Sequence, residues 1–245
     1  PDRQSMQLIH SSLNVGVLPR VPRMVCVEVI PFLKFLGLKQ IDEYPVFVLN
    51  FLALLGWNPG TSQEIFSMDQ LIAAFSLARV NKAGARFDIQ KALWFNQQYM
   101  RAKPVEELAG MLSAAAATEQ FVCEPAKAMK IAAALRDRIT FPADLWNQAS
   151  IFFKKPGQYD RQLAATKWTA EAVRFCQLLA PLLAETDALT AAGAKLLIEK
   201  AAAQAGVKAG AAMPALRLAL TGGSGGPDLP LTIELLGAQE TVARI

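Results

Sequence analysis

The stretch VFVLNFLALLGWNPGTSQEIFSMDQLIAAF, residues 46–75, combines an apolar run, a turn and a second amphipathic segment. Pro45 precedes the apolar run, where proline suits the first turn of a helix, and Gly56 follows it, where glycine often ends one. Asn-Pro-Gly at 58–60 is typical of a turn. Ser67 and Gln70 have the spacing of a capping box at the start of a helix. The stretch therefore predicts two short helices joined by a turn.

Helical periodicity continues along the rest of the chain. Asp88 is a candidate N-cap for a helix that carries Ala92, Phe95 and Tyr99 on one face. We expect Pro181 to end or kink the helix that contains it. Further helices are predicted at 105–117, from 125, around 144–146, near 168–183 and at 186–205. Because strands do not alternate with helices, the fold class is mainly α, without a complete Rossmann catalytic domain.

Composition argues against several kinds of site. The three cysteines, Cys26, Cys123 and Cys176, lie far apart and have neither zinc-site nor disulfide-framework spacing, so we expect a reducing cytoplasm. A Ser/His/Asp triad would depend on the single histidine, His10. The longest apolar run, residues 44–57, is shorter than the roughly 18 residues of a membrane span, so no membrane partner is expected.

Basic residues concentrate in the middle of the chain. Residues 79–103 carry six basic side chains against one acid, and residues 127–167 carry eight against three. Such clustering indicates contact with a polyanion, with nucleic acid as the first candidate. On the charge alone, an ordinary solvated face is the favoured interpretation.

A glycine-rich loop, ALTGGSGGPD at 219–228, raises the question of nucleotide binding. A P-loop needs a lysine and a hydroxyl after its glycines, whereas Pro227 and Asp228 follow here. We therefore predict a flexible connection between two helices. Asp228 is expected to be the N-cap of the second helix, with Pro230 in its first turn.

Three blocks together resemble the bacterial glutamyl-tRNA synthetases. The first, 48–100, contains LGWNPG, EIFSMDQL, RVNKAGARFD and WFNQQY in family order, as in the stem-contact region that follows the catalytic domain. The second, 130–146, has the general shape of KIAALRDRITFPADLW with one more alanine, and resembles the first anticodon-binding subdomain. The third, 211–237, contains the family's Pro-x-x-Arg-x-Ala-Leu-Thr-Gly segment of the second subdomain.

The resemblance implies a domain organisation. A stem-contact helical region at 45–103 is followed by an all-α anticodon-binding bundle with subdomains at 104–176 and 177–245. Residues 1–44 match nothing in the family, and one interpretation is a remnant of the end of the catalytic domain. The family's His-Ile-Gly-His-like motif is absent, and VLPRVPR at 17–23 lacks the lysines and serine of its second ATP motif. Catalytic residues are therefore expected upstream and none in this chain.

The resemblance also implies a function. These enzymes activate glutamate with ATP and transfer it to the terminal ribose of their tRNA. This chain would hold the part that binds tRNA(Glu), inactive alone, in a monomeric cytoplasmic ligase. Glutamate, ATP and magnesium would bind only with the catalytic domain, so no cofactor or metal is expected in this chain.

Candidate tRNA contacts follow from the matched blocks. Arg79, Lys82 and Arg86 are expected to meet the backbone of the inner tRNA stem, since cations neutralise phosphates. A solvated loop is the alternative for these three residues, but the resemblance favours the tRNA contact.

The anticodon side has five further candidates. Arg136 and Arg138 would pair with base edges, although helix solubility explains them as well. Lys154 and Lys155 would contact phosphates or remain solvated. Arg217 matches the family arginine and would contact the anticodon loop or support the fold.

Two alternatives stay open. The chain could be a helical RNA-binding or interaction protein of this family without ligase activity, or a nucleotide-binding enzyme that uses the glycine loop. Trp57, Trp94 and Trp168 occur at apolar helical spacing, so we expect all three to pack in the core rather than stack on bases.

Overall fold

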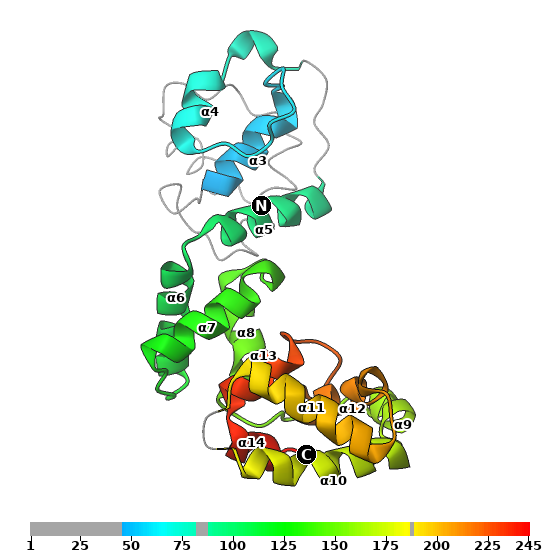
Figure 1. Cartoon of the computed structure of the whole chain (residues 1–245). Helices are drawn as coiled ribbons and strands as arrows, with labels where there is room; N and C mark the ends of the chain where they lie inside the picture. The colour runs from blue at the N-terminus through cyan, green and yellow to red at the C-terminus, as the bar shows by residue number, and fades with distance from the viewer. Residues whose placement is uncertain (1–45, 82–87, 187–188) are drawn as a thin grey trace, which may run out of the picture. The chain divides into compact units, whose positions relative to one another are not determined.

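The computed structural model describes residues 46–81, 88–186 and 189–245 (Figure 1). Within these ranges the chain forms α- and 3-10 helices joined by turns, and one isolated antiparallel bridge pairs Trp57 with Val80. The prediction of a mainly α fold is confirmed. The unmatched segment at 1–44 lies outside the described residues.

The chain divides into two compact units, residues 1–102 and 103–245. The first unit contains α3 (Val46–Gly56), α4 (Met68–Ala74), η2 (Leu77–Arg79) and α5 (Ile89–Ala102). In the second unit, the predicted boundary between residues 176 and 177 falls within helix α10 (Ala170–Ala184). The division of this unit into two anticodon-binding subdomains stays a prediction.

Side-chain caps begin two helices of the first unit as predicted. Ser67 Oγ accepts from the Gln70 amide at 3.2 Å, and Gln70 Oε1 accepts from the Ser67 amide at 2.9 Å, which completes the capping box of α4. Asp88 Oδ1 accepts from the amides of Gln90 and Lys91 at 2.9 and 3.2 Å, and so caps α5. These caps satisfy amides that the first helical turn leaves without a partner.

The core of the first unit lies between α3 and α5. The rings of Phe51 and Phe95 lie 5.7 Å apart. A buried polar contact accompanies them, because Asn50 Oδ1 accepts from the Phe66 amide at 2.7 Å and lies 2.8 Å from the Tyr99 hydroxyl. Burial raises the pKa of Tyr99, so its hydroxyl stays protonated and can donate. The contact between Tyr99 and Asn50 joins α5 to α3. The bond from the Phe66 amide to Asn50 holds the loop before α4 against α3.

The second unit is a larger helical bundle. Its helices are α6 (Val105–Thr118), α7 (Pro125–Leu135), η3 (Arg136–Arg138), α8 (Pro142–Ala149), η4 (Ser150–Phe152), α9 (Arg161–Lys167), α10, α11 (Ala191–Ala205), α12 (Ala209–Thr221), α13 (Leu229–Leu236) and α14 (Ala238–Val242). The main core of this unit is built largely from α10 to α13, with large side chains that include Phe175, Leu179, Leu183, Ile198, Leu216 and Ile233. Small alanines on α11 let neighbouring helices approach closely.

Two predicted helix limits differ from the structure. The helix predicted at 186–205 begins at Ala191, because the side chain of Thr190 accepts from the Gly193 amide at 3.1 Å and caps it there. Helix α10 continues past Pro181 to Ala184. A proline removes one backbone donor, and here the helix ends within one further turn.

The tryptophan prediction was correct for one residue of three. Trp57 is 2% exposed and packs edge-on against Phe66, with ring centroids 5.9 Å apart. Trp94 and Trp168 are 39% and 40% exposed, so the prediction that they pack in the core was wrong. Trp94 lies at the edge of the buried face of α5, and Trp168 follows the last residue of α9. Helical periodicity locates a buried face but does not fix how far burial extends around it.

Candidate nucleic-acid interface

Arg79 is held at the surface of the first unit by the Asn-Pro-Gly turn. Its Nη1 group donates to the carbonyl of Pro59, and the residue remains exposed. Gly60 has a φ of +76°, and a Cβ there would lie 3.3 Å from this nitrogen. The glycine therefore lets the guanidinium pack against the turn. Lys82 and Arg86, predicted beside Arg79, lie outside the described residues.

Arg136 and Arg138 lie on the 3-10 turn η3 that directly follows α7. The carbonyl of Arg138 accepts from Gln148 Nε2 at 3.0 Å, which ties this turn to α8. Arg138 is exposed and Arg136 is half-buried. The turn thus presents Arg138 to solvent from a backbone that is fixed on both sides.

Arg217 extends from α12 toward the glycine loop. Its Nη1 group donates to the carbonyl of Pro227 at 2.6 Å. Burial lowers the pKa of Arg217 below its ordinary value, and the positive charge of Arg138 lowers it further, while Asp228 raises it. Arg138 and Arg217, predicted from separate sequence blocks, both belong to the second unit.

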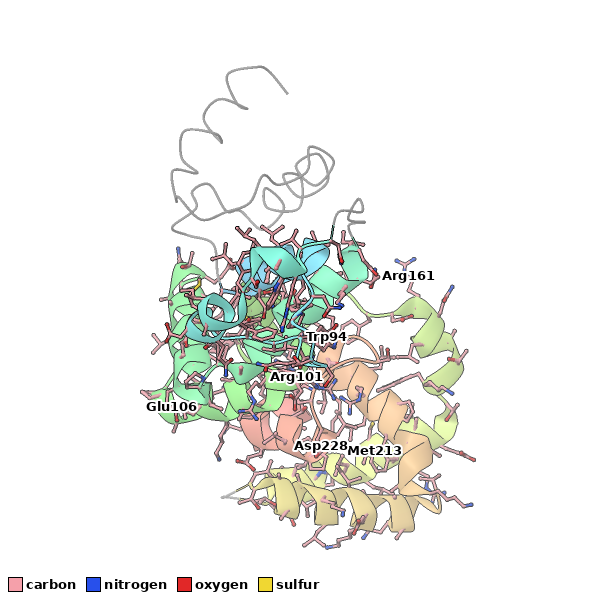
Figure 2. The ribbon with its side chains drawn as sticks, turned by 90° about the horizontal axis from the view of Figure 1, so that it is seen from above. Trp94, Arg101, Glu106, Arg161, Met213 and Asp228 are labelled. Atoms are coloured by element: carbon pink, nitrogen blue, oxygen red, sulfur yellow. The ribbon has the colours of Figure 1, made fainter. Side chains whose placement is uncertain are left out.

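An open pocket of about 240 Å³ adjoins Arg217. Its lining comes from α9, α12 and the glycine loop and consists of Leu163, Gly210, Met213, Pro214, Arg217 and Ser224. Met213 on α12, and Asp228 just before α13, are labelled in Figure 2. The pocket thus combines apolar walls with one guanidinium, although sequence reasoning had identified only the arginine.

The glycine loop is held by contacts along its length. Gly222 has a φ of +79°, and a Cβ there would lie 2.5 Å from the carbonyl oxygen of Gln158. The Gly222 carbonyl accepts from the Asp160 amide at 2.8 Å. The hydroxyl of Thr221 lies 2.8 Å from the Arg217 carbonyl. The loop connects α12 to α13 as predicted, and its first glycine, Gly222, packs against residues 156–160. Its flexibility stays a prediction.

The start of α13 agrees with the prediction in position. Asp228 precedes the helix and Pro230 lies in its first turn, but the Asp228 side chain makes no capping hydrogen bond. Its carboxylate instead influences Arg217, as its effect on that residue's pKa indicates.

ATP and magnesium, which the resemblance implies for a full enzyme, do not fit the glycine loop. The hydroxyl of Thr221 is directed at carbonyls of its own segment, and no lysine follows the glycines. In the part of the chain that the structure describes, no three His, Cys, Asp or Glu side chains gather as a metal site would require. We derive no nucleotide chemistry from these residues.

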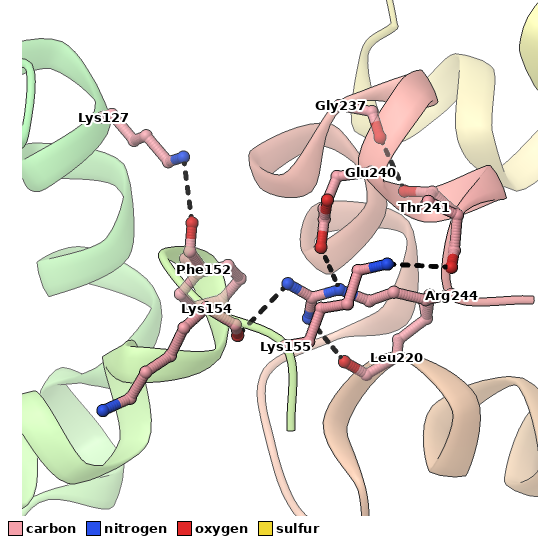
Figure 3. A network of polar contacts seen from close by, with 10 residues as sticks. Lys127, Phe152, Lys154, Lys155, Leu220, Gly237, Glu240, Thr241 and Arg244 are labelled. Atoms are coloured by element: carbon pink, nitrogen blue, oxygen red, sulfur yellow. Dashed lines mark hydrogen bonds and ion pairs between the residues drawn. The ribbon is translucent and has the colours of Figure 1, made fainter. Parts of the chain in front are cut away.

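Lys155 contacts the C-terminal segment rather than projecting freely. Its Nζ group donates to the Ala243 carbonyl at 3.3 Å (Figure 3). Lys154 Nζ lies 4.0 Å from a carboxylate oxygen of Glu119 and 5.9 Å from the centroid of the Trp146 ring. Both lysines are exposed, so these contacts leave them accessible to solvent.

Sequence reasoning missed Arg244, whose side chain is only 1% exposed. It donates to the Leu220 carbonyl at 2.8 Å and to Glu240 at 2.7 Å, and its Nη2 group reaches the Lys154 carbonyl at 3.3 Å (Figure 3). The sequence offers one signal, the spacing of four between Glu240 and Arg244. The buried guanidinium joins the end of α12 to the backbone of the loop that begins with Lys154 and Lys155, the basic loop.

An aromatic cluster beside the basic loop was missed as well. Trp146 lies 5.4 Å from Phe153 and 5.9 Å from Phe121, measured between ring centroids. Lys127 Nζ lies 5.5 Å from the centre of the Phe153 ring. These residues come from separate segments, so no local pattern could have joined them.

Residues 101–245 match the family model described as the anticodon binding domain. The chain belongs to this family. The match contains η3, α12 and the glycine loop, so Arg138, Arg217 and the pocket that Arg217 lines all lie inside the anticodon-binding domain.

Curated and solved relatives agree with the resemblance. The chain is 44% identical over 212 residues to a glutamate–tRNA ligase of Cytophaga hutchinsonii, covering 86% of this chain and 41% of that protein. It is 38% identical over 209 residues to the glutamate–tRNA ligase of Amoebophilus asiaticus, covering 85% of this chain and 41% of that protein. A crystal structure of a glutamate tRNA ligase from Elizabethkingia meningosepticum superposes with a TM-score of 0.75 at 35% identity, covering 81% of this chain and 39% of that one. The chain thus spans about two fifths of the length of these relatives.

The predicted site residues fall into different environments. Within the anticodon-binding domain, Arg217 lines the pocket and Arg138 lies on η3, whereas Lys155 reaches toward the C-terminus. Arg79 belongs to the first unit, residues 1–102. No helix within the described ranges is long and apolar enough to cross a membrane.

Proposed function

We propose that this chain is the tRNA-binding part of a glutamate–tRNA ligase. The observation that carries the proposal is the open pocket that Arg217 lines within the anticodon-binding domain. The complete ligase would join glutamate to tRNA(Glu) through an adenylate made with ATP. Those steps belong to catalytic residues that this chain does not contribute.

The pocket has the chemistry that an unstacked base requires. Apolar walls from Leu163, Met213 and Pro214 offer contact to a flat base, and Arg217 offers planar donors. One donor of Arg217 already holds Pro227, and this bond orients the remaining donors. Arg138, which is exposed on a fixed turn, is suited to a base edge or a neighbouring phosphate.

Contacts outside the pocket would supply affinity. We assign Arg79, with Lys82 and Arg86 from the same block, to the inner stem of the tRNA, because cations on a phosphate backbone strengthen binding without reading sequence. Lys154 and Lys155 are exposed beside the aromatic cluster and would meet phosphates near the anticodon stem. In this proposal the ligase is a cytoplasmic monomer, as a chain with three widely spaced cysteines allows.

Substitution of Arg138 tests the assignment. Arg138→Gln should weaken binding to an anticodon stem–loop by about 1–3 kcal/mol, since Arg–base pairs are worth that much. Arg174→Gln on α10 makes the same charge change at another exposed arginine and should leave the affinity within about twofold. Equal affinities of the two variants for the stem–loop would refute the role of Arg138.

A further inference from the structure

Glu234 on α13 binds two other helices at once. One of its carboxylate oxygens pairs with Lys130 Nζ on α7, and the other accepts from the Ala191 amide at 2.6 Å, in the first turn of α11. The Glu234 side chain is only 16% exposed, whereas Lys130 is 58% exposed. A mostly buried carboxylate thus joins α7 to the bundle that carries Arg217.

A second lysine of α7 supports the same attachment. Lys127 Nζ donates to the Phe152 carbonyl at 3.2 Å, and η4, which contains Phe152, packs against α13 (Figure 3). Helix α7 itself also packs against α13. Lys127 and Lys130, nearly one helical turn apart, therefore attach α7 to η4 and to α13.

The position of α7 determines where Arg138 lies. Helix α7 passes directly into η3, so Arg138 follows Lys130 by eight residues. Arg217 is tied to the start of α13, because its Nη1 group donates at 2.6 Å to the carbonyl of Pro227, the residue before Asp228. Lys130 on α7 pairs with Glu234 on α13, so this contact joins the helix that leads to Arg138 to the helix whose start is tied to Arg217. A shift of α7 along α13 would change the distance between Arg138 and Arg217.

We propose that Glu234 is a positioning residue that sets the spacing of Arg138 and Arg217 for the anticodon loop. This inference rests on the proposed function, because its consequence is measured as RNA affinity. The Lys130 and Ala191 hydrogen bonds hold the pKa of Glu234 below its ordinary value of 4.5, so the carboxylate is charged at neutral pH. Glu234 acts through the two arginines and does not itself contact the RNA.

Lys130→Gln tests the inference in the full chain, because it removes the partner on α7 and leaves the Glu234–Ala191 bond in place. Its matched control is Lys103→Gln, which makes the same charge change and breaks the Lys103–Glu107 pair in the same unit. We expect Lys130→Gln to bind the anticodon stem–loop roughly three- to tenfold more weakly than Lys103→Gln. The Lys130→Arg variant, which restores the pair, should regain most of that loss.

The salt dependence separates positioning from direct contact. If Lys130 only positions α7, the slope of log affinity against log salt should equal that of Lys103→Gln. A slope reduced by about one would identify Lys130 as a phosphate contact and overturn the inference. In an Arg138→Gln background, Lys130→Gln should cause little further loss, whereas fully additive losses would also contradict it.

A measurement without RNA distinguishes this inference from the proposed function. The arginine Nε–H signals of Arg138 and Arg217 should shift in the NMR spectrum of Lys130→Gln and stay in place in Lys103→Gln. Unshifted signals in Lys130→Gln would overturn the positioning role, whatever the chain binds. Shifted signals in a protein that fails to bind the stem–loop would retain the coupling between these residues and refute the proposed function instead.

Discussion

The guanidinium of Arg217 donates a 2.6 Å hydrogen bond to the backbone carbonyl of Pro227, across the glycine loop. This bond joins the middle of α12 to the residue that precedes Asp228 and α13. The arginine therefore supports the fold at the same place where it faces the pocket. The sequence left these two roles as alternatives, and the structure provides a contact for the supporting one.

Arg217→Met should destabilise the second unit, because the Pro227 carbonyl loses its donor. Methionine keeps an unbranched apolar side chain at this position, so the change tests mainly the hydrogen bond. We expect a fall of about 1–3 kcal/mol in the free energy of unfolding, measured by urea titration. Arg217→Lys keeps the charge but not the planar donor, so it should recover only part of this loss. An unchanged urea midpoint in Arg217→Met would refute the supporting role.

Gly222→Ala should be destabilising because both the backbone and the space around it require glycine. Its φ is +79°, and a Cβ would lie 2.5 Å from the Gln158 carbonyl. We expect a loss of about 1–3 kcal/mol in thermal or urea unfolding. Gly225→Ala is the control, since a Cβ there meets nothing within 4 Å, and it should change stability by no more than about 0.5 kcal/mol. Equal effects of the two substitutions would contradict the packing of the loop.

Arg244→Met should remove the buried link between α12 and the basic loop. The Leu220 carbonyl would lose its donor and Glu240 its ionic partner, so we expect a loss of about 2–4 kcal/mol in the free energy of unfolding. Hydrogen exchange at the backbone around Lys154 should accelerate as well. Arg174→Met, at an exposed position of α10, should have little effect on either measurement. A similarly stable Arg244→Met protein would show that the network contributes no net stability.

Acid should weaken the attachment of α7 through Glu234. Its pKa is lower in the folded chain than its ordinary value of 4.5, mainly through the Lys130 hydrogen bond and then through the Ala191 amide. A lowered carboxylate pKa stabilises the fold above about pH 4.5, and this stabilisation is lost as the pH falls through the folded pKa. The difference in unfolding free energy between the wild type and Glu234→Gln should therefore shrink between about pH 6 and pH 3. A difference that is constant across this range would argue against an ionised Glu234.

Local signals in the sequence predicted local structure well. The Ser67–Gln70 capping box and the Asp88 cap depend on residues within three positions of each other, so their spacing alone carries the information. The fold class followed from helical periodicity. The resemblance additionally identified Arg217 through a short contiguous motif.

Contacts between distant segments could not be predicted in this way. Arg244 reaches a carbonyl 90 positions earlier in the chain, and Lys130 pairs with a carboxylate 104 positions later. Such partners depend on how complete helices pack, which periodicity does not specify. The prediction for Trp94 was wrong for a similar reason, because an apolar pattern does not show where the buried face of a helix ends.

The most direct test of the central claim is a titration of the full chain with tRNA(Glu) and with a tRNA that carries a mismatched anticodon, at several salt concentrations. Phosphate contacts from two separate units should make the binding tight and strongly dependent on salt. Arg138 and the pocket lined by Arg217 should make it prefer tRNA(Glu). Equally weak binding to both RNAs would contradict the account and favour a helical protein of this family without a role in the ligase.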